Sequence, residues 1–299
     1  MKPPFEFDHT LEKCPLCKSN KIFFLYAIVH SNPSFTVYQC KDCKFIFMNP
    51  PLTETSERAL YDEGYYTGVA DYTYYDERMV EHYAQYVWNA RLKTIRKYVK
   101  SGNFLDIGCS FGGFLQAASN YFTVYGIEPS HYSGLYAQQR FGNDKIHIGT
   151  LFDHSFAPNT FSVITMIEVL EHIRKPYDAL KECYKLCTDN GLLIIQTANM
   201  DGLQAKLQKD TYGYFLPGHF SYFNKQNLVK TLKHIGFKNV KIFQPVDFGL
   251  LPKLLKSQMN FKSIKDYTSW LRISGYHFMS KIHIGNFALT SSMVVYAFK

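Results

Sequence analysis

Residues 101–299 alternate between short apolar runs and longer stretches in which apolar side chains recur every three or four positions. The first pattern is typical of buried strands and the second of amphipathic helices. Their alternation predicts a mostly parallel sheet with helices on both faces. The predicted strands are Asn103–Ile107, Thr123–Glu128, Lys145–Ile148, Phe161–Ile167, Leu192–Thr197, Asn239–Phe243 and Ser292–Phe298.

The helices predicted between these strands are Gly112–Asn120, Ser130–Phe141, Tyr177–Cys187 and Lys225–Ile235. The turn-forming residues Thr188–Gly191 are expected to separate one of these helices from the next strand. We therefore expect residues 101–299 to form one doubly wound α/β domain with a seven-stranded, mostly parallel sheet.

Residues 51–100 are predicted to form a helical linker with a tyrosine-rich lid. The expected helices are Glu54–Tyr61 and Arg78–Lys100, and five tyrosines lie between residues 64 and 75. A loop of this kind is expected to close over a bound ligand. A packing surface between domains is the alternative.

Residues 1–50 contain two C-x2-C pairs, Cys14 with Cys17 and Cys40 with Cys43, separated by 22 residues. Two β-prone runs between the pairs predict a hairpin that brings four thiolates together around one structural Zn²⁺. Iron in the same cage is the alternative, and disulfides are disfavoured in the cytoplasmic protein that we expect. The sequence therefore predicts a small N-terminal zinc ribbon.

Composition supports a folded protein, because only 19% of the 299 residues are charged while 46% are hydrophobic. No apolar run reaches the ~18–20 residues needed to cross a bilayer, and the first residues do not resemble a signal peptide. We therefore expect a soluble, cytoplasmic protein. Its formal net charge is +8, and the last third of the chain carries 14 basic and 4 acidic residues. This excess predicts either an anionic partner or a solvated lysine face.

The first strand of the α/β domain runs into a turn with small residues at Gly108, Ser110 and Gly112, and the second strand ends in Glu128. Small residues let a ligand approach a helix N-terminus, and an acidic residue at the tip of the second strand suits a ribose diol. The turn therefore predicts a nucleoside-containing ligand. A dinucleotide site is disfavoured because Ser110 breaks G-x-G-x-x-G. A hydrolase elbow (G-x-S-x-G) is disfavoured because such elbows follow several strands of their own sheet.

The stretches FLDIGCSFGGFL, VYGIEPS, FSVITMIEVLEHIRKP and NGLLIIQTAN resemble class I S-adenosylmethionine-dependent methyltransferases. Together with CPLC…CKDC, MNPPLTETSERALYDEGYY and GHFSYFNKQNLVKTLKHIGF, the chain as far as Phe243 resembles a bacterial subfamily with an N-terminal zinc ribbon. Members of that subfamily are associated with sugar or surface-polysaccharide modification. The chain departs from the usual pattern at Ser110, where a glycine is common, and at Ser162, where an aspartate is common.

The resemblance implies a set of residues that bind the cofactor S-adenosylmethionine. Its methionine end is assigned to Asp106, Gly108, Cys109 and Gly112, its ribose to Glu128, and its adenine to Thr150 and Leu151. Arg91 resembles an arginine that holds the cofactor carboxylate in quinone O-methyltransferases, with a solvated helix charge as the alternative.

Two histidines are candidates for the general base that takes a proton from the methyl acceptor. His172 follows the fourth strand next to Glu171, and His219 lies in an aromatic loop that also holds Tyr222. Histidine accepts a proton near neutral pH. The string Glu168–His172 also resembles the divalent-metal site of ubiquinone-pathway O-methyltransferases, so a metal-assisted reaction stays open.

Residues 244–291 are predicted to form a basic insertion. Its segment 251–272 carries five lysine or arginine residues and one acid among apolar residues. A contact with a membrane surface, a lid over a phosphorylated substrate, and a packed helical insertion are all compatible with this pattern.

These observations favour a methyltransferase that acts on a small or carrier-linked anionic molecule, such as a nucleotide- or lipid-linked sugar. The alternatives are a metal-assisted quinone- or catechol-type O-methyltransferase, an RNA methyltransferase that uses the ribbon as reader, and a non-catalytic scaffold. Nucleic acid is disfavoured because the ribbon has only a small positive excess.

Overall fold

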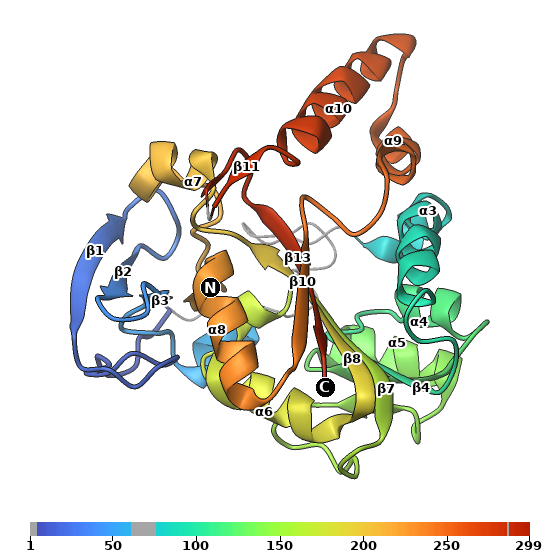
Figure 1. Ribbon diagram of the computed structural model, residues 1–299, viewed down its shortest axis with the longest axis horizontal. Helices are drawn as coiled ribbons and strands as arrows, with labels where there is room; N and C mark the ends of the chain where they lie inside the picture. The colour runs from blue at the N-terminus through green and yellow to red at the C-terminus, as the bar shows by residue number, and fades with distance from the viewer. Residues whose placement is uncertain (1–4, 61–75, 286) are drawn as a thin grey trace.

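The structure is a computed structural model in which residues 5–60, 76–285 and 287–299 are described. Its centre is a seven-stranded sheet in the order β10-β13-β8-β7-β4-β5-β6 (Figure 1). The strands are β4 (Asn103–Ile107), β5 (Thr123–Glu128), β6 (Ile146–Ile148), β7 (Phe161–Ile167), β8 (Cys187–Ala198), β10 (Asn239–Phe243) and β13 (Ser292–Phe298). All neighbours pair in parallel except β13, which is antiparallel to β8 and β10. The predicted seven-stranded, mostly parallel sheet is confirmed.

Helices cover both faces of this sheet (Figure 1). One face carries α3 (Glu77–Ile95), α4 (Gly113–Ala118) and α5 (His131–Phe141), and the other carries α6 (Pro176–Leu186) and α8 (Lys225–Ile235). Alternate strand residues point to opposite faces, so Leu193 and Ile195 join one core while Leu192 and Ile194 join the other. The period-2 pattern of the strands therefore creates two cores.

Two predicted boundaries differ from the structure by five residues. Strand β8 begins at Cys187 and not at Leu192, because its pairing with β7 shifts from Phe161–Cys187 to Val163–Leu192 and the turn residues lie inside this irregularity. Helix α3 ends at Ile95 and not at Lys100, since the N–H of Lys97 bonds the carbonyl of Thr94 in a tighter turn.

A second, smaller sheet lies beside the central one. It contains β1 (Ile22–Ile28), β2 (Phe35–Cys40) and β3 (Ile46–Met48), and its fourth strand is β9 (Ser221–Tyr222) from the distant part of the chain. Ile46 pairs with Tyr222 and Phe47 with Ser221. The N-terminal residues therefore share a sheet with the loop that was predicted to hold the methyl acceptor.

The small sheet also shares its core with the central sheet. Phe45 and Phe47 belong to the same buried cluster as Leu193 and Ile195 of β8. The ring centroid of Phe45 lies 4.9 Å from that of Phe223, which follows β9. Residues before and after the domain boundary predicted near residue 50 therefore share one continuous hydrophobic core.

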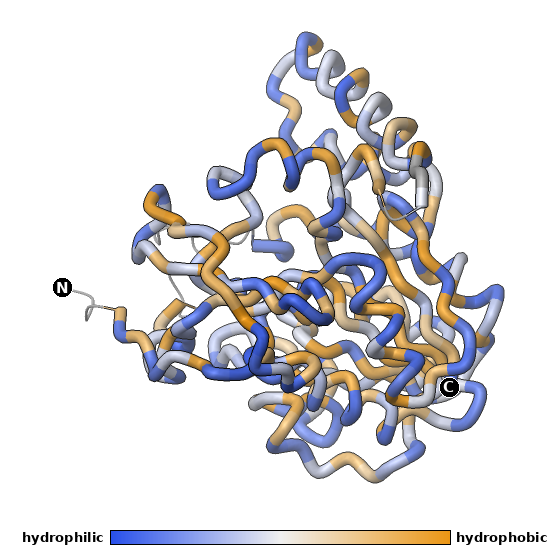
Figure 2. The backbone as a smooth tube through the Cα atoms, turned by 60° about the vertical axis from the view of Figure 1, so that its left-hand side comes forward, coloured by the Kyte–Doolittle hydropathy of each residue, from blue (hydrophilic) through white to orange (hydrophobic). Residues whose placement is uncertain are grey.

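Helix α1 spans Glu54–Leu60, and the tyrosine-rich segment predicted as a lid lies largely outside the described residues. The predicted insertion forms α9 (Leu250–Ser257), α10 (Ser269–Met279), β11 (His283–Ile284) and β12 (Phe287–Ala288). In Figures 1 and 2, α9 and α10 project away from the central sheet, and we call residues 250–282 the C-terminal arm. Short helices complete the described chain at α7 (Leu203–Gln208), η1 (Leu170–His172), η2 (Lys209–Thr211), η3 (Gln258–Asn260) and η4 (Ile264–Thr268). Among the described helices, none is long and apolar enough to cross a membrane.

The shared core predicts that Phe45→Ala destabilises the whole protein. Its ring is fully buried, so we expect the free energy of unfolding to fall by about 3–5 kcal/mol. Urea unfolding followed by circular dichroism measures the change. Phe24→Ala is the matched control, because that ring on the small sheet is 53% exposed and its loss should cost about 0.5 kcal/mol or less. Equal effects of the two substitutions would contradict the shared core.

Candidate active site

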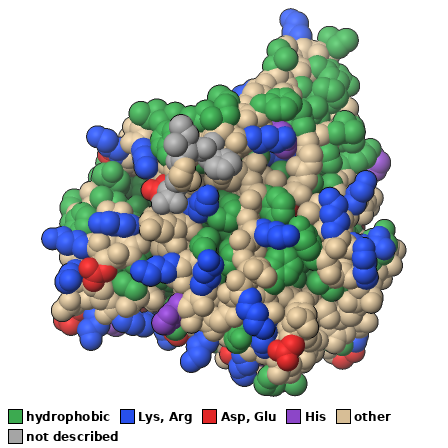
Figure 3. Space-filling view, viewed as in Figure 1, with side chains coloured by type: hydrophobic (Ala, Val, Ile, Leu, Met, Phe, Trp, Pro, Cys, Tyr) green, Lys and Arg blue, Asp and Glu red, His purple; other side chains and the backbone are tan. Residues whose placement is uncertain are grey.

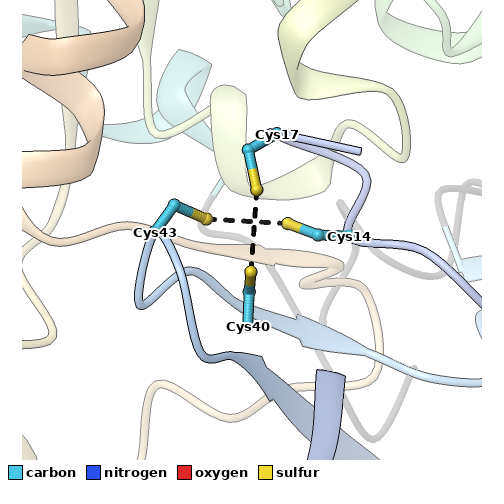
Figure 4. Close-up of side chains that lie close together, drawn as sticks. All are labelled: Cys14, Cys17, Cys40 and Cys43. Carbon is cyan, nitrogen blue, oxygen red and sulfur yellow. Dashed lines mark hydrogen bonds between the residues drawn. The ribbon is translucent and has the colours of Figure 1, made fainter. Parts of the chain in front are cut away.

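The four cysteines of the N-terminal pairs converge on one point (Figure 4). The Sγ atoms of Cys14 and Cys43 lie 3.7 Å apart, and those of Cys17 and Cys40 lie 3.6 Å apart. Four thiolates bound to zinc at about 2.3 Å have sulfur–sulfur separations of about 3.8 Å, whereas a disulfide bond is about 2.05 Å long. The thiols are free in the structure, and their spacing fits a four-thiolate metal site.

The two cysteine pairs have the same backbone hydrogen bonds. The N–H of Cys14 donates to Ser19 and the N–H of Lys18 to Cys14, and the same two bonds recur between Cys40, Lys44 and Phe45. Lys18 and Lys44 both adopt a left-handed φ, of 62° and 59°. This repeated turn orients both thiols of each pair toward the centre.

The predicted cofactor turn lies between β4 and α4 and is hydrogen-bonded to the end of β5. The backbone N–H of Ser110 donates to Glu128 Oε2 at 2.8 Å, and that of Ser130 donates to Glu128 Oε1 at 3.0 Å. Only 3% of the Glu128 residue surface is exposed, so its carboxylate needs these donors. Glu128 thus fixes the turn that would receive the cofactor.

Two glycines of this turn have left-handed backbones that favour glycine. Gly108 has φ 75°, and a Cβ there would lie 2.6 Å from Val169 Cγ2. Gly112 has φ 79°, and a Cβ there would lie 2.5 Å from the ring of Phe141. Both positions therefore require glycine, because Val169 and Phe141 pack where a Cβ would lie.

Asp106 and Arg91 lie beneath this turn. Thr165 donates a 2.6 Å hydrogen bond to Asp106 Oδ1, and burial raises the pKa of Asp106 to about 8. Arg91 Nε donates to Asp247 Oδ1 at 3.2 Å, and its Nη2 donates to Gln196. Arg91 is a buried, paired side chain, so the alternative of a solvated helix charge is wrong.

A cleft of about 2200 Å³ lies at the carboxyl ends of β4, β5 and β7. One side is formed by the cofactor turn and the ends of the strands, and the other by N-terminal residues 8–15 and by α1. The predicted residues that line it are Arg91, Asp106, Gly108, Cys109, Glu128, Thr150, Leu151 and His172. The predicted residues Gly112, Glu171, His219 and Tyr222 are absent from the described lining.

The two candidate histidines contact each other, with ring centroids 4.6 Å apart. His172 Nδ1 lies 2.9 Å from the carbonyl of Gly218, and His219 Nδ1 lies 2.8 Å from the carbonyl of Tyr214. A carbonyl only accepts hydrogen bonds, so each Nδ1 carries the proton and each Nε2 is the basic nitrogen. Burial lowers the pKa of His172 to about 4 and that of His219 well below its usual range. Both rings are therefore neutral at pH 7.

Glu171 lies behind these rings. Its carboxyl group is fully buried and accepts a 2.5 Å hydrogen bond from the hydroxyl of Tyr214. Burial, with Glu168 nearby, raises the pKa of Glu171 well above its usual range. One ligand atom each from Glu171, His172 and His219 lies within 4.8 Å of the others. Tyr222 is fully buried in the apolar cluster of the small sheet, next to Phe215.

Two residues that contribute to this region were not predicted from the sequence. Tyr214 hydrogen-bonds Glu171 from a loop whose only pattern is a high aromatic content. Arg174 lines the cleft and lies 3.6 Å from both Asp8 and Glu57, so it pairs with the N-terminal side. The motif HIRKP shows that a basic residue, Arg174, follows the fourth strand. It gives no sign that this residue pairs with Asp8 and Glu57, which lie far away in the sequence.

The central sheet has one antiparallel strand, and a turn of small residues bonded to Glu128 follows β4. This combination is typical of a class I methyltransferase fold. A family model described as a methyltransferase domain matches residues 80–242, more than half of the chain, so the chain belongs to this family. The protein is an S-adenosylmethionine-dependent methyltransferase.

Two curated proteins and a solved structure are among those similar to this chain. An uncharacterized protein of Methanocaldococcus jannaschii is 28% identical over 55% of this chain and 70% of its own length. A ubiquinone biosynthesis O-methyltransferase of Glaesserella parasuis is 33% identical, over 32% of this chain and 44% of that enzyme. The solved structure of Haemonchus contortus phosphoethanolamine N-methyltransferase 2 with S-adenosyl-L-methionine covers 93% of this chain and 68% of its own, with a TM-score of 0.56 and 16% identity.

The hydrogen bonds of Glu128 predict that Glu128→Gln weakens cofactor binding. A glutamine amide presents an N–H to one of the two backbone N–H groups, so we expect S-adenosylhomocysteine to bind about 5–100-fold more weakly. Calorimetric titration measures the dissociation constant. Asp189→Asn, at a side chain that is 91% exposed, is the control for charge removal. An unchanged dissociation constant in Glu128→Gln would contradict the assignment.

Proposed function

We propose that the protein methylates a hydroxyl group of a sugar-like, carrier-linked acceptor, with His172 as the general base. The observation that carries the proposal is that His172 lines the same cleft as the cofactor turn while Gly218 orients its ring. Asp106, Gly108, Cys109 and Glu128 would hold S-adenosylmethionine there. Bound in this way, S-adenosylmethionine supplies an electrophilic methyl group and leaves as S-adenosylhomocysteine.

The chemistry required of the chain is to orient the acceptor and to take one proton. His172 Nε2 accepts the hydroxyl proton, and the carbonyl of Gly218 stabilises the imidazolium through the Nδ1 proton. His219 contacts His172 and supports its ring position. At pH 7 this base is unprotonated, and its Nε2 takes the hydroxyl proton as the oxygen forms its new bond to the methyl group.

The lining of the cleft supports a neutral, hydroxyl-rich reacting group. Among the described residues it contains more carboxylates than lysine and arginine side chains, and carboxylates accept hydrogen bonds from sugar hydroxyls. Of the lysine and arginine residues in the last third of the chain, only Lys256 is in this described lining. The anionic partner predicted from that basic third is therefore better placed outside the cleft, as the carrier of the acceptor.

The four cysteines are proposed to bind one structural Zn²⁺. Four protein ligands leave no open position for a substrate, so the metal would hold the N-terminal residues together and take no part in the reaction. Its effect would reach the active site through β3, which directly follows the second cysteine pair. The N–H of Met48 donates to the carbonyl of Phe220, and the N–H of Phe220 donates to the carbonyl of Glu171.

A second candidate is metal-assisted methylation of a catechol-like acceptor. The observation in its favour is the close approach of ligand atoms from Glu171, His172 and His219. The position of Glu171 opposes it, because its carboxyl group already accepts a hydrogen bond from Tyr214 and is absent from the described lining of the cleft. Loss of transfer on chelation of Mg²⁺, with catechols as acceptors, would support this candidate over the first.

Replacing His172 tests the base. With nucleotide- and lipid-linked sugars as acceptors, we expect His172→Asn to lower kcat by about 10²–10⁴-fold and to leave the affinity for S-adenosylhomocysteine within about twofold. Because the base must be unprotonated and its pKa is about 4, the wild-type rate should stay level from pH 8 to pH 6 and fall only at more acidic pH.

The control for this substitution is His30→Asn, at an exposed histidine of the small sheet. A wild-type rate that halves near pH 6.5, or a His172→Asn enzyme with unchanged kcat, would rule out a buried histidine base.

Removal of zinc tests the structural site. Metal analysis is expected to find one zinc per chain, and a chelator should reduce the methyl-transfer rate more than the affinity for S-adenosylhomocysteine. The reason is that β3 pairs with β9 next to His219, whereas the bonds of Glu128 involve only the turns after β4 and β5. Added zinc should restore the rate. Equal loss of both properties, or a protein without metal, would contradict the proposal.

A further inference from the structure

The C-terminal arm exposes an unusual number of large apolar side chains. Seven of the sixteen exposed large apolar residues in the described structure lie between residues 251 and 282, although this segment is about a tenth of the chain. They are Leu251 (62% exposed), Ile264 (86%), Tyr267 (46%), Leu271 (78%), Phe278 (57%), Met279 (47%) and Ile282 (56%). Such a concentration of exposed apolar side chains is typical of a surface that binds a protein or a membrane.

Three of these side chains form a stripe along α10 and the turn that follows it. Leu271 and Phe278 are seven positions apart, and Ile282 follows four positions later in the turn that ends the helix, so all three share one face. A neighbouring face of the helix packs inward, where Trp270 Nε1 donates to Ser257 Oγ at 3.0 Å and His277 is buried. Helix α10 thus has two apolar faces: one packs against α9 and η4, and the other is exposed to solvent.

The arm is also rich in positive charge. The arm carries six cations: Lys253, Lys256, Lys262, Lys265, Arg272 and Lys281. Its one acid, Asp266, accepts hydrogen bonds from the backbone N–H groups of Lys262 and Ser263. In Figure 3, the arm shows hydrophobic and basic side chains and no acidic ones in this view.

A groove where the arm joins the rest of the protein carries further positive charge. It has a volume of about 670 Å³ and lies between α3, α8, the end of β10 and the arm. Lys93 and Lys97 of α3, Lys225 of α8 and Lys281 of the arm line it. Its carboxylate, Asp247, is already paired with Arg91. The cations of the arm therefore continue onto the body of the protein.

We propose that the C-terminal arm docks on an anionic lipid surface, with the Leu271–Phe278–Ile282 stripe entering the interface and the lysines contacting the head groups. Apolar side chains rimmed by cations match the chemistry of such a surface. A second copy of the arm is a poor occupant, because two faces of the same positive sign repel each other. This inference does not depend on the proposed acceptor. Lys256 lies on α9 and also lines the cleft, so docking would bring lipid-linked acceptors close to the site.

Vesicle sedimentation with the full chain tests the proposal. Binding is expected to vesicles of phosphatidylcholine mixed with phosphatidylglycerol, to be much weaker with phosphatidylcholine alone, and to fall as salt is raised. Leu271→Ser combined with Phe278→Ser should weaken binding at least about tenfold, and so should Arg272→Ser combined with Lys281→Ser. The control is Leu135→Ser on α5, a leucine that is 52% exposed and far from the arm in sequence.

The outcomes separate this inference from the methyltransferase assignment. Circular dichroism and titration with S-adenosylhomocysteine verify that each variant is folded and retains its cofactor site. Equal binding to neutral and anionic vesicles, no binding at low salt, or equal weakening by Leu135→Ser would overturn the proposal. So would a dimer in size-exclusion chromatography that the Leu271→Ser, Phe278→Ser variant abolishes, because it would identify a second copy as the occupant.

Discussion

The backbone pairing of β3 with β9 is the interaction on which the acceptor side of the active site depends. Two residues of the distant loop, Ser221 and Tyr222, complete a sheet whose other strands lie in the first fifty residues. The same loop is hydrogen-bonded on its other side to η1, through Phe220 to Glu171 and through Gly218 to His172. The histidines are therefore held between two elements that are far apart in sequence, and neither element would orient them alone.

The proposed cofactor side is built differently, from the ends of β4, β5 and β7, which lie side by side in the central sheet. Glu128 and Ser110 are separated by one helix, and Asp106 and Thr165 lie on adjacent parallel strands. Buried carboxyl groups are stable there because backbone N–H groups or a hydroxyl group satisfy them. The proposed cofactor site thus lies within the central sheet, whereas the proposed acceptor site depends on pairing with the N-terminal sheet.

This difference also explains what could be predicted from the sequence. The seven strands and the cofactor turn were predictable because period-2 patterns, small residues and Glu128 are local features. The convergence of Cys14, Cys17, Cys40 and Cys43 was predictable from their spacing. The β3–β9 pairing was not, since a two-residue strand has no periodicity. The contacts of Tyr214 and Arg174 were not, since their partners lie more than forty residues away. For the arm, the pattern predicts an amphipathic basic segment but does not say which apolar residues stay uncovered.

During translation, β9 is synthesised long after β3, the strand with which it pairs. When Ile46–Met48 leaves the ribosome, its partner in the small sheet lies about 175 residues further along the message. At ~5–20 residues per second, the edge of β3 waits roughly 9–35 s for Ser221–Tyr222. An unpaired edge next to Phe45 and Phe47 is a template for pairing with other nascent chains. The N-terminal sheet of a growing chain is therefore a natural point of engagement for a chaperone.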